Sequence, residues 1–158
     1  MEKFLEYLYE ADKKIQTVDH MANVTFPLIK DKRLLIKILT EINLAMLSCI
    51  NAILQYEYIY NRIPLTKDAA TNLNIFKKRC APSYNIGQDE ITTIVDIIEL
   101  NEKHKKSPFE FIKEGKVVIL SENLRAETIT IERLKSFIIT IKTLLKKTKS
   151  KIVENYHY

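Results

Sequence analysis

The stretch DKRLLIKILTEINLAMLSCINAILQYEYIYNR, residues 31–62, decides the fold of this chain. Read at 3.6 residues per turn, it carries two apolar faces. The first consists of Leu35, Ile38, Ile42, Ala45, Cys49, Ala52, Tyr56 and Tyr60, and the second of Ile36, Leu39, Leu47, Ile50 and Leu54. Because a surface helix needs only one such face, the pattern predicts a helix in the interior of a helical bundle. At 1.5 Å per residue this helix would be roughly 45–50 Å long, enough for the spine of a small domain.

The ends of this helix also have signals in the sequence. Asp31 is suited to cap its N-terminus, and the run YEYIY at residues 56–60 predicts the end that meets solvent, because tyrosine hydroxyls usually lie near water or a polar partner. Its most apolar part, residues 44–54, is too short for a membrane span, which needs about 20 predominantly apolar residues. We therefore expect a core helix rather than a transmembrane helix.

The composition is that of one helical domain covering residues 1–158. The chain has 2 Gly, 4 Pro and no Trp, and it contains no low-complexity tract. Its N-terminus, MEKFLEYLYEADKK, is charged and amphipathic from the start, unlike a signal peptide, so we expect a cytoplasmic protein. Cys49 and Cys80 lack the spacing of a metal site and are expected to be reduced packing residues.

Further helices are predicted before and after the spine. The first covers residues 2–25 and should end or kink at Pro27, and the next covers residues 68–79 and should close at Pro82. A fourth runs from the N-cap Gly87 to about residue 105. The last covers residues 130–155, and its core-facing positions are expected to be Leu134, Phe137, Ile138, Ile141, Leu145, Thr148 and Ile152.

The segment after residue 106 carries two kinds of signal. Ser107, Pro108 and Glu110 match a capping residue, a first-turn proline and a capping-box acid, which predicts a short helix that stops at Gly115. Residues 116–120 and 127–129 favour an extended conformation and predict a hairpin or strap laid over the helices. The expected fold is therefore all-α, a five- or six-helix bundle around a long central helix, with a small extended strap or hairpin.

Basic residues gather in the last helix. Residues 133–151 hold seven Lys and Arg and no acid, which exceeds the net charge of +5, so the rest of the chain is slightly acidic. Four lysines form a stripe about a quarter-turn from the core-facing positions: Lys135, Lys142, Lys146 and Lys149. This stripe is a candidate surface for nucleic acid or for an acidic protein partner. The alternative is a solvated helix face, because no aromatic residue is interleaved for base stacking before Tyr156.

A candidate acidic groove lies between the first helix and the spine. Asp12 and Asp19 are seven residues apart on the edge of the first helix's apolar face. In an antiparallel pair of helices, Asp19 comes level with Glu41 and Asp12 with Ser48. These side chains could form a cation or proton site in which one carboxyl pKa is raised. The alternative is that the acids are solvated or pair with lysines.

No motif in the chain names a reaction, a cofactor or a metal. Gly87 and Gly115 are the only glycines and lie far apart, so the phosphate-binding and dinucleotide-binding loops are absent. No Glu-x-x-His pair supports a di-iron bundle. His20 and His104 are expected to be exposed, and the end of a helix suits His104 because of the helix dipole. We therefore predict no catalytic residue, no cofactor and no metal ligand, and leave open whether the protein is an enzyme.

The order of the pieces resembles a group of short archaeal proteins without an assigned activity. The segments that carry the resemblance are LEYLYEADKKIQTVDHM, FPLIKDKRLLIKIL, INAILQYEYIY, FKKRCAPSYNI, EKHKKSPFEF and KVVILSENLR. The resemblance implies a helical fold and a cytoplasmic location, and it carries no functional residues. A looser likeness is to HEPN-type bundles, whose nucleolytic members have an Arg a few residues before a His. No Arg precedes His20 or His104 in this way, which puts a nuclease activity in doubt.

Three functions follow as expectations, of which the third is an enzyme that uses the groove of Asp12, Asp19 and Glu41. The first is a non-enzymatic interaction module without a membrane partner, which self-associates as a homodimer if the neighbouring helices leave one face of the spine uncovered. The second is binding of nucleic acid, such as RNA, or of a nucleotide by the lysine stripe.

Overall fold

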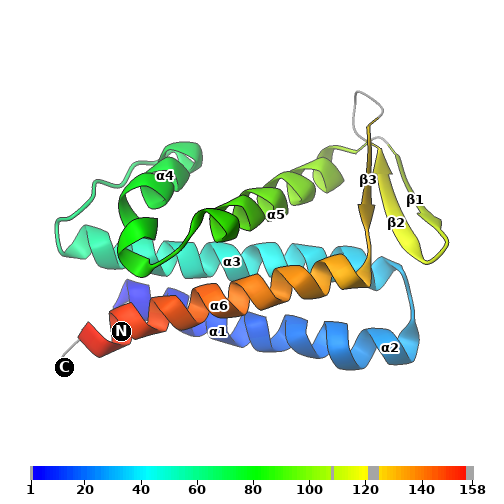
Figure 1. Ribbon diagram of the computed structural model, residues 1–158, viewed down its shortest axis with the longest axis horizontal. Helices are drawn as coiled ribbons and strands as arrows, with labels where there is room; N and C mark the ends of the chain where they lie inside the picture. The colour runs from blue at the N-terminus through cyan, green and yellow to red at the C-terminus, as the bar shows by residue number, and fades with distance from the viewer. Residues whose placement is uncertain (1, 108, 121–124, 156–158) are drawn as a thin grey trace.

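The interior helix of the bundle is α3 (Arg33–Ile59), in a computed structural model that describes residues 2–107, 109–120 and 125–155 (Figure 1). It packs against α1 (Lys3–His20), α5 (Gln88–Lys106) and α6 (Ile131–Asn155). Both predicted apolar faces contribute buried residues, such as Ile38 on one face and Leu39 on the other. The predicted all-α bundle around a long central helix is therefore confirmed.

The two ends of α3 largely follow the sequence signals. At its start, the Asp31 carboxylate accepts a hydrogen bond from the Arg33 amide at 3.0 Å, although the capping position itself is Lys32. At its other end, Tyr58, Ile59 and Tyr60 are exposed, as the tyrosine-rich run predicted. Helix α3 is long and apolar enough to cross a membrane, but more than half of its most apolar window is buried within the protein. That burial is the pattern of a core helix.

The first predicted helix continues past its proline. The π-helical turn Met21–Thr25 joins α1 to the short helix α2 (Phe26–Ile29), which contains Pro27. A proline ring clashes with the carbonyl four residues earlier in a regular α-helix, and the wider π turn relieves that clash. Pro27 thus distorts the helix without ending it. The chain reverses at Lys30, which has a left-handed backbone with φ 55°.

The short helix predicted from Ser107 to Gly115 is wrong. Residues Phe109–Lys113 form strand β1, which pairs antiparallel with β2 (Lys116–Leu120). Glu114 and Gly115 both have positive φ and form the tight turn that joins the two strands. The Ser107 hydroxyl donates to the Leu120 carbonyl at 2.7 Å instead of capping a helix. The Pro108 part of that prediction lies outside the described residues.

The extended strap is a small sheet. The predicted hairpin of β2 and β3 (Ala126–Ile129) is present, and within the described residues β1 adds a third strand beside β2. Val117, Ile119 and Ile129 are buried against the helices, and β2 contacts both α3 and α5. The connection predicted for residues 121–126 lies for the most part outside the described residues. The sheet lies at one end of the bundle, and α4 (Ala69–Ile75) lies at the opposite end (Figure 1).

The segment around α4 turns more often than the sequence indicated. Asp68 caps α4 by accepting a hydrogen bond from the Thr71 amide at 3.1 Å. The chain then makes a π-helical turn, Phe76–Cys80, and a 3-10 turn, Ala81–Tyr84. Pro82 lies inside this second turn and does not close the helix. Gly87 is the N-cap of α5, as predicted, but the Glu90 side chain bonds Lys147 and forms no capping box.

Helix α6 follows its prediction closely. All seven positions expected to face the core are buried. Both cysteines are buried and free: the Cys49 sulfur lies 3.3 Å from the Thr148 hydroxyl of α6, and Cys80 ends the π turn. Figure 1 shows α6 beside α1 and α3 along most of the bundle. The side of α6 that carries its lysines is therefore not part of the core.

Candidate functional site

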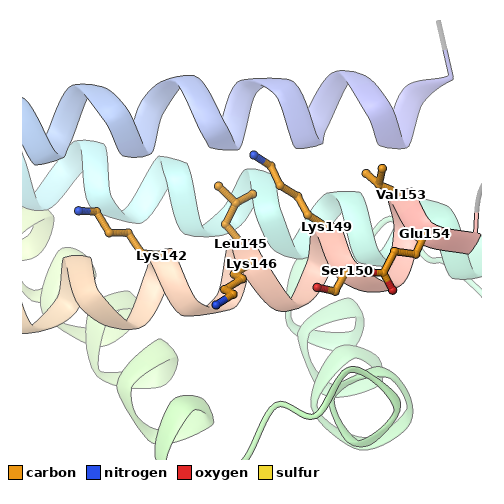
Figure 2. Close-up of a pocket in the computed structure, with 7 residues that line it drawn as sticks. All are labelled: Lys142, Leu145, Lys146, Lys149, Ser150, Val153 and Glu154. Atoms are coloured by element: carbon orange, nitrogen blue, oxygen red, sulfur yellow. The ribbon is translucent and has the colours of Figure 1, made fainter.

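The lysine stripe lies along a shallow hollow on α6. The hollow has a volume of about 450 Å³, and Figure 2 shows the residues that line it: Lys142, Leu145, Lys146, Lys149, Ser150, Val153 and Glu154. Lys142, Leu145 and Lys149 point toward α1, whereas Lys146 and Ser150 point away from it (Figure 2). The stripe is thus divided between two sides of the helix, and Lys135 is half-buried outside this hollow.

The side of the stripe that faces α1 is neutralised by the predicted acidic groove. Lys142 Nζ lies 2.7 Å from Asp19 Oδ1, and Lys149 Nζ lies 3.2 Å from Asp12 Oδ1. Two sets of residues that the sequence suggested as separate sites are therefore partners of one another. Exposed or half-exposed ion pairs of this kind connect helices and add little binding capacity for a ligand.

The other members of the acidic groove do not join Asp12 and Asp19 in a cluster. Glu41 pairs with Lys14 at 3.9 Å, and Ser48 is buried. Each of the three carboxylates thus has its own lysine. Over the described ranges, no group of three or more His, Cys, Asp or Glu side chains could hold a metal ion.

A more convergent polar site lies at the C-terminal end of α3, in a second hollow of about 430 Å³. It is lined by Tyr56, Glu57, Arg62, Ile63, Arg79, Ser83 and Lys151. Glu57 is only 4% exposed, although it carries a charge and belongs to a core helix. A buried carboxylate needs a partner, because removal from water penalises the charged form. Arg62 is that partner, and its Nε contacts Glu57 Oε2.

The helix end explains how Arg62 reaches Glu57. Asn61 has a left-handed backbone with φ 59°, and the Arg62 amide donates to the Glu57 carbonyl at 3.0 Å. This pattern ends a helix and folds the chain back over its last turn. The Arg62 guanidinium consequently lies over the rings of Tyr56 and Tyr60, at 5.3 and 4.9 Å from their centroids. Cation–π contacts and the ion pair together hold this side chain at the mouth of the hollow.

Two more basic residues come to the same hollow from distant segments. Arg79, on the π turn after α4, donates from Nη2 to the Arg62 carbonyl at 2.9 Å. Lys151, near the end of α6, donates to the Ser83 carbonyl at 2.8 Å and lies over the Tyr84 ring. Since Glu57 is already bonded to Arg62, the lining has an excess of positive charge. The hollow is therefore suited to an anion.

Beneath the hollow lie side chains with little access to water. Burial raises the pKa of the Tyr84 hydroxyl well above its ordinary value, and the nearby Glu57 carboxylate raises it further. The Tyr84 hydroxyl makes no hydrogen bond of normal geometry to any described residue. Burial, followed by Glu57, raises the pKa of the Cys80 thiol to about 12. Both groups are thus protonated at neutral pH and unsuited to act as nucleophiles.

The hollows form a connected series along the C-terminal half of α6. A third hollow, of about 490 Å³, shares Lys146 and Ser150 with the first and Ser83 and Lys151 with the second. Lys147 lies between them and donates to the Asn85 carbonyl at 2.6 Å as well as to Glu90. Because Glu90 neutralises Lys147, we call this surface the basic face and define it by Arg62, Arg79, Lys146 and Lys151. It is continuous from α6 to the end of α3.

Of the basic face, the sequence-predicted stripe contains only Lys146. The convergence of Arg62 with Arg79 and Lys151 could not be predicted from the spacing of these residues in the sequence. A local signal did exist, because Glu57 is the only acidic residue between Glu41 and Asp68. No protein-family model matches the chain, and no curated protein matches it significantly.

Proposed function

We propose that the protein is a non-enzymatic binding module whose basic face holds a single-stranded nucleic acid. The observation that carries this proposal is the convergence of Arg62, Arg79 and Lys151, from three separate segments, on one hollow. Positively charged grooves that follow a phosphate backbone are the common feature of proteins that bind single strands.

Aromatic side chains at the same end favour a single strand over a duplex. Tyr58 and Tyr60 are exposed, and Tyr60 is already stacked against Arg62. Unpaired bases can stack on such rings and on the guanidinium plane, whereas the bases of a duplex are stacked on one another. The connected hollows along α6 offer room for neighbouring phosphates. A mononucleotide would fill only one of them.

Binding without catalysis agrees with the chemistry of the site. The buried thiol and phenol near Glu57 are protonated at neutral pH, and Glu57 itself is engaged by Arg62. The likeness to HEPN-type bundles, without their nucleolytic Arg–His motif, is compatible with the same proposal. A cytoplasmic location would give such a module access to RNA.

Self-association has less support from the geometry. The expected reason for it was an uncovered face of α3, and both faces of that helix are largely buried within a single chain. On α6, Ile139 and Val153 are exposed, but Lys142 and Lys146 lie between them. Like charges would repel each other across a twofold contact at this surface. Light scattering should therefore show a monomer at micromolar concentration.

A salt titration with a fluorescently labelled single-stranded oligonucleotide tests the proposed function. Occupation of phosphates by Arg62, Arg79 and Lys151 predicts a slope of log affinity against log salt of about −2, from roughly 0.7 per phosphate on a single strand. RNA and DNA of the same sequence should be compared. Absence of binding at low salt would refute the proposal.

A further inference from the structure

The end of the bundle opposite α4 carries two turns that lie together. One joins α2 to α3 at residues 30–32, and the other joins β1 to β2 at Glu114 and Gly115 (Figure 1). They are in contact, because Lys32 Nζ lies 3.5 Å from the position that a Cβ on Gly115 would occupy. Lys32 also lies over the Phe26 ring, at 5.3 Å from its centroid. The two turns thus form one continuous surface.

This surface exposes large apolar side chains. Leu28 is 80% exposed, Ile29 is 63% exposed, and Ile112, beside the strand turn, is 55% exposed. Single exposed apolar residues are common on soluble proteins, but adjacent ones at a projecting turn are a feature of interaction sites.

Basic residues flank these apolar side chains in the sequence of both turns. Within the described residues, the two turns and their flanks contribute Lys30, Lys32, Arg33, Lys113 and Lys116, against Asp31 and Glu114. Asp31 is engaged by Arg33, with 2.9 Å between Asp31 Oδ2 and Arg33 Nη2. The two turns therefore combine an excess of positive charge with exposed apolar side chains. We call these five basic residues together with Leu28, Ile29 and Ile112 the basic tip.

We propose that the basic tip binds the surface of an anionic lipid bilayer, with Leu28 and Ile29 entering the headgroup region. Peripheral proteins are held on membranes by burial of apolar area and by attraction to anionic lipids. The apolar side chains of the basic tip can supply the first contribution, and its lysines can supply the second. A nucleic acid would use the lysines but would offer nothing to Leu28 and Ile29. A protein partner requires about 800 Å² of buried surface on each side, more than a few projecting side chains supply.

This inference concerns peripheral contact, and α3 stays inside the bundle. It departs from the sequence-based expectation that the protein has no membrane partner. It is also independent of the proposed nucleic-acid site, because the basic face and the basic tip lie at opposite ends of α3 (Figure 1). A molecule attached by the tip would direct the basic face away from the bilayer, so both surfaces could be occupied together.

Co-sedimentation with lipid vesicles gives the first test. The protein should pellet with vesicles of phosphatidylcholine mixed with phosphatidylserine, should remain in solution with phosphatidylcholine alone, and should be released by salt. Leu28→Asp with Ile29→Asp, or Lys32→Glu with Lys116→Glu, should each weaken binding about tenfold or more. The matched controls are Ile139→Asp, at an exposed position of α6, and Lys78→Glu, at an exposed position near α4.

A fluorescence measurement provides a second test that does not depend on the folding of the charge-substituted variants. The chain has no Trp, so Leu28→Trp introduces a unique reporter at the tip. Its emission should shift to shorter wavelength when vesicles containing phosphatidylserine are added, and the emission of Ile139→Trp should not. Arg79→Glu should leave vesicle binding unchanged. An unshifted Leu28→Trp spectrum, or equal losses in tip and control variants, would overturn the inference.

Discussion

Lys142 on α6 and Asp19 on α1 form an ion pair with 2.7 Å between Nζ and Oδ1, across 123 positions of sequence. Lys149, seven residues after Lys142, and Asp12, seven residues before Asp19, form a second ion pair with 3.2 Å between Nζ and Oδ1. Seven residues make two helical turns, so the two pairs are successive contacts of antiparallel helices. Their role is to connect α1 and α6. The charge available to a ligand lies on the basic face instead.

Loss of one of these pairs should have a small effect. Lys142→Ala should lower the free energy of unfolding by about 0.5 kcal/mol or less, because both partners are substantially exposed to water. The control is Lys146→Ala. Lys146 is a neighbouring lysine that forms no ion pair with the described residues. Urea unfolding measures both. A loss above about 2 kcal/mol for Lys142→Ala would contradict this account of the pair.

The ion pair of Glu57 and Arg62 should matter more. Arg62→Ala leaves a buried carboxylate without its partner and should lower the free energy of unfolding by about 1–3 kcal/mol, since the Arg62 side chain is itself half-exposed. In a Glu57→Gln background the same substitution should cost clearly less, because no buried charge is left behind. Thermal unfolding of the four proteins forms a double-mutant cycle. Equal losses in both backgrounds would show that Arg62 stabilises the fold by other contacts.

Glu127 provides a prediction for pH. Burial raises the pKa of Glu127, but hydrogen bonds from Lys103 and Arg133, at 3.0 and 3.2 Å, outweigh burial and hold it below the ordinary 4.5. A carboxylate with a lowered folded-state pKa adds stability above its unfolded-state pKa and loses it as pH falls through the folded-state value. Glu127→Gln should therefore destabilise the protein by about 0.5–1 kcal/mol at pH 7. The difference from the parent protein should disappear in strong acid, and a difference that persists there would count against the pairing.

The cysteines should be inert in the folded protein. Burial raises the pKa of Cys49 and of Cys80 to about 12, so neither has appreciable thiolate at pH 8. A thiol-reactive disulfide reagent should label neither residue in the native state and both in guanidinium. Rapid labelling of Cys80 at native conditions would mean that the turn Phe76–Cys80 opens readily.

The sequence was sufficient to predict helices α3 and α6 and the faces that they bury, because hydrophobic periodicity alone determines both. Helix α6 buries all seven positions that its 3.6-residue pattern selected, and α3 buries most of its own, because the face that a residue occupies is fixed by its position in a regular helix. The hairpin of β2 and β3 was predicted by its β-branched residues for the same local reason. These elements also define the bundle, so the fold class followed from them.

Features that depend on tertiary contacts were missed. The capping signals of Ser107 and Glu110 were overridden when β1 paired with β2, since the sheet supplies partners that a helix would otherwise need. The alternative that Asp12 and Asp19 pair with lysines is the one that the structure shows, but the identity of the lysines was missed because it depends on α6 lying against α1. Arg62, Arg79 and Lys151 meet only after the chain reverses at Asn61 and α6 returns to the end of α3. The local sequence around each residue does not determine that the three side chains lie close together in the fold.

The most direct test of the central claim uses two neighbouring substitutions with equal change of charge. Arg79→Glu alters the hollow that Arg62 and Lys151 share, whereas Lys78→Glu alters an exposed lysine on the same π turn, outside that hollow. Fluorescence anisotropy with a single-stranded oligonucleotide at low salt should show about a tenfold or greater loss of affinity for Arg79→Glu, with a shallower salt slope. Lys78→Glu should remain close to the parent protein. Equal affinities for the two variants, or binding unaffected by both, would contradict the assignment of the basic face.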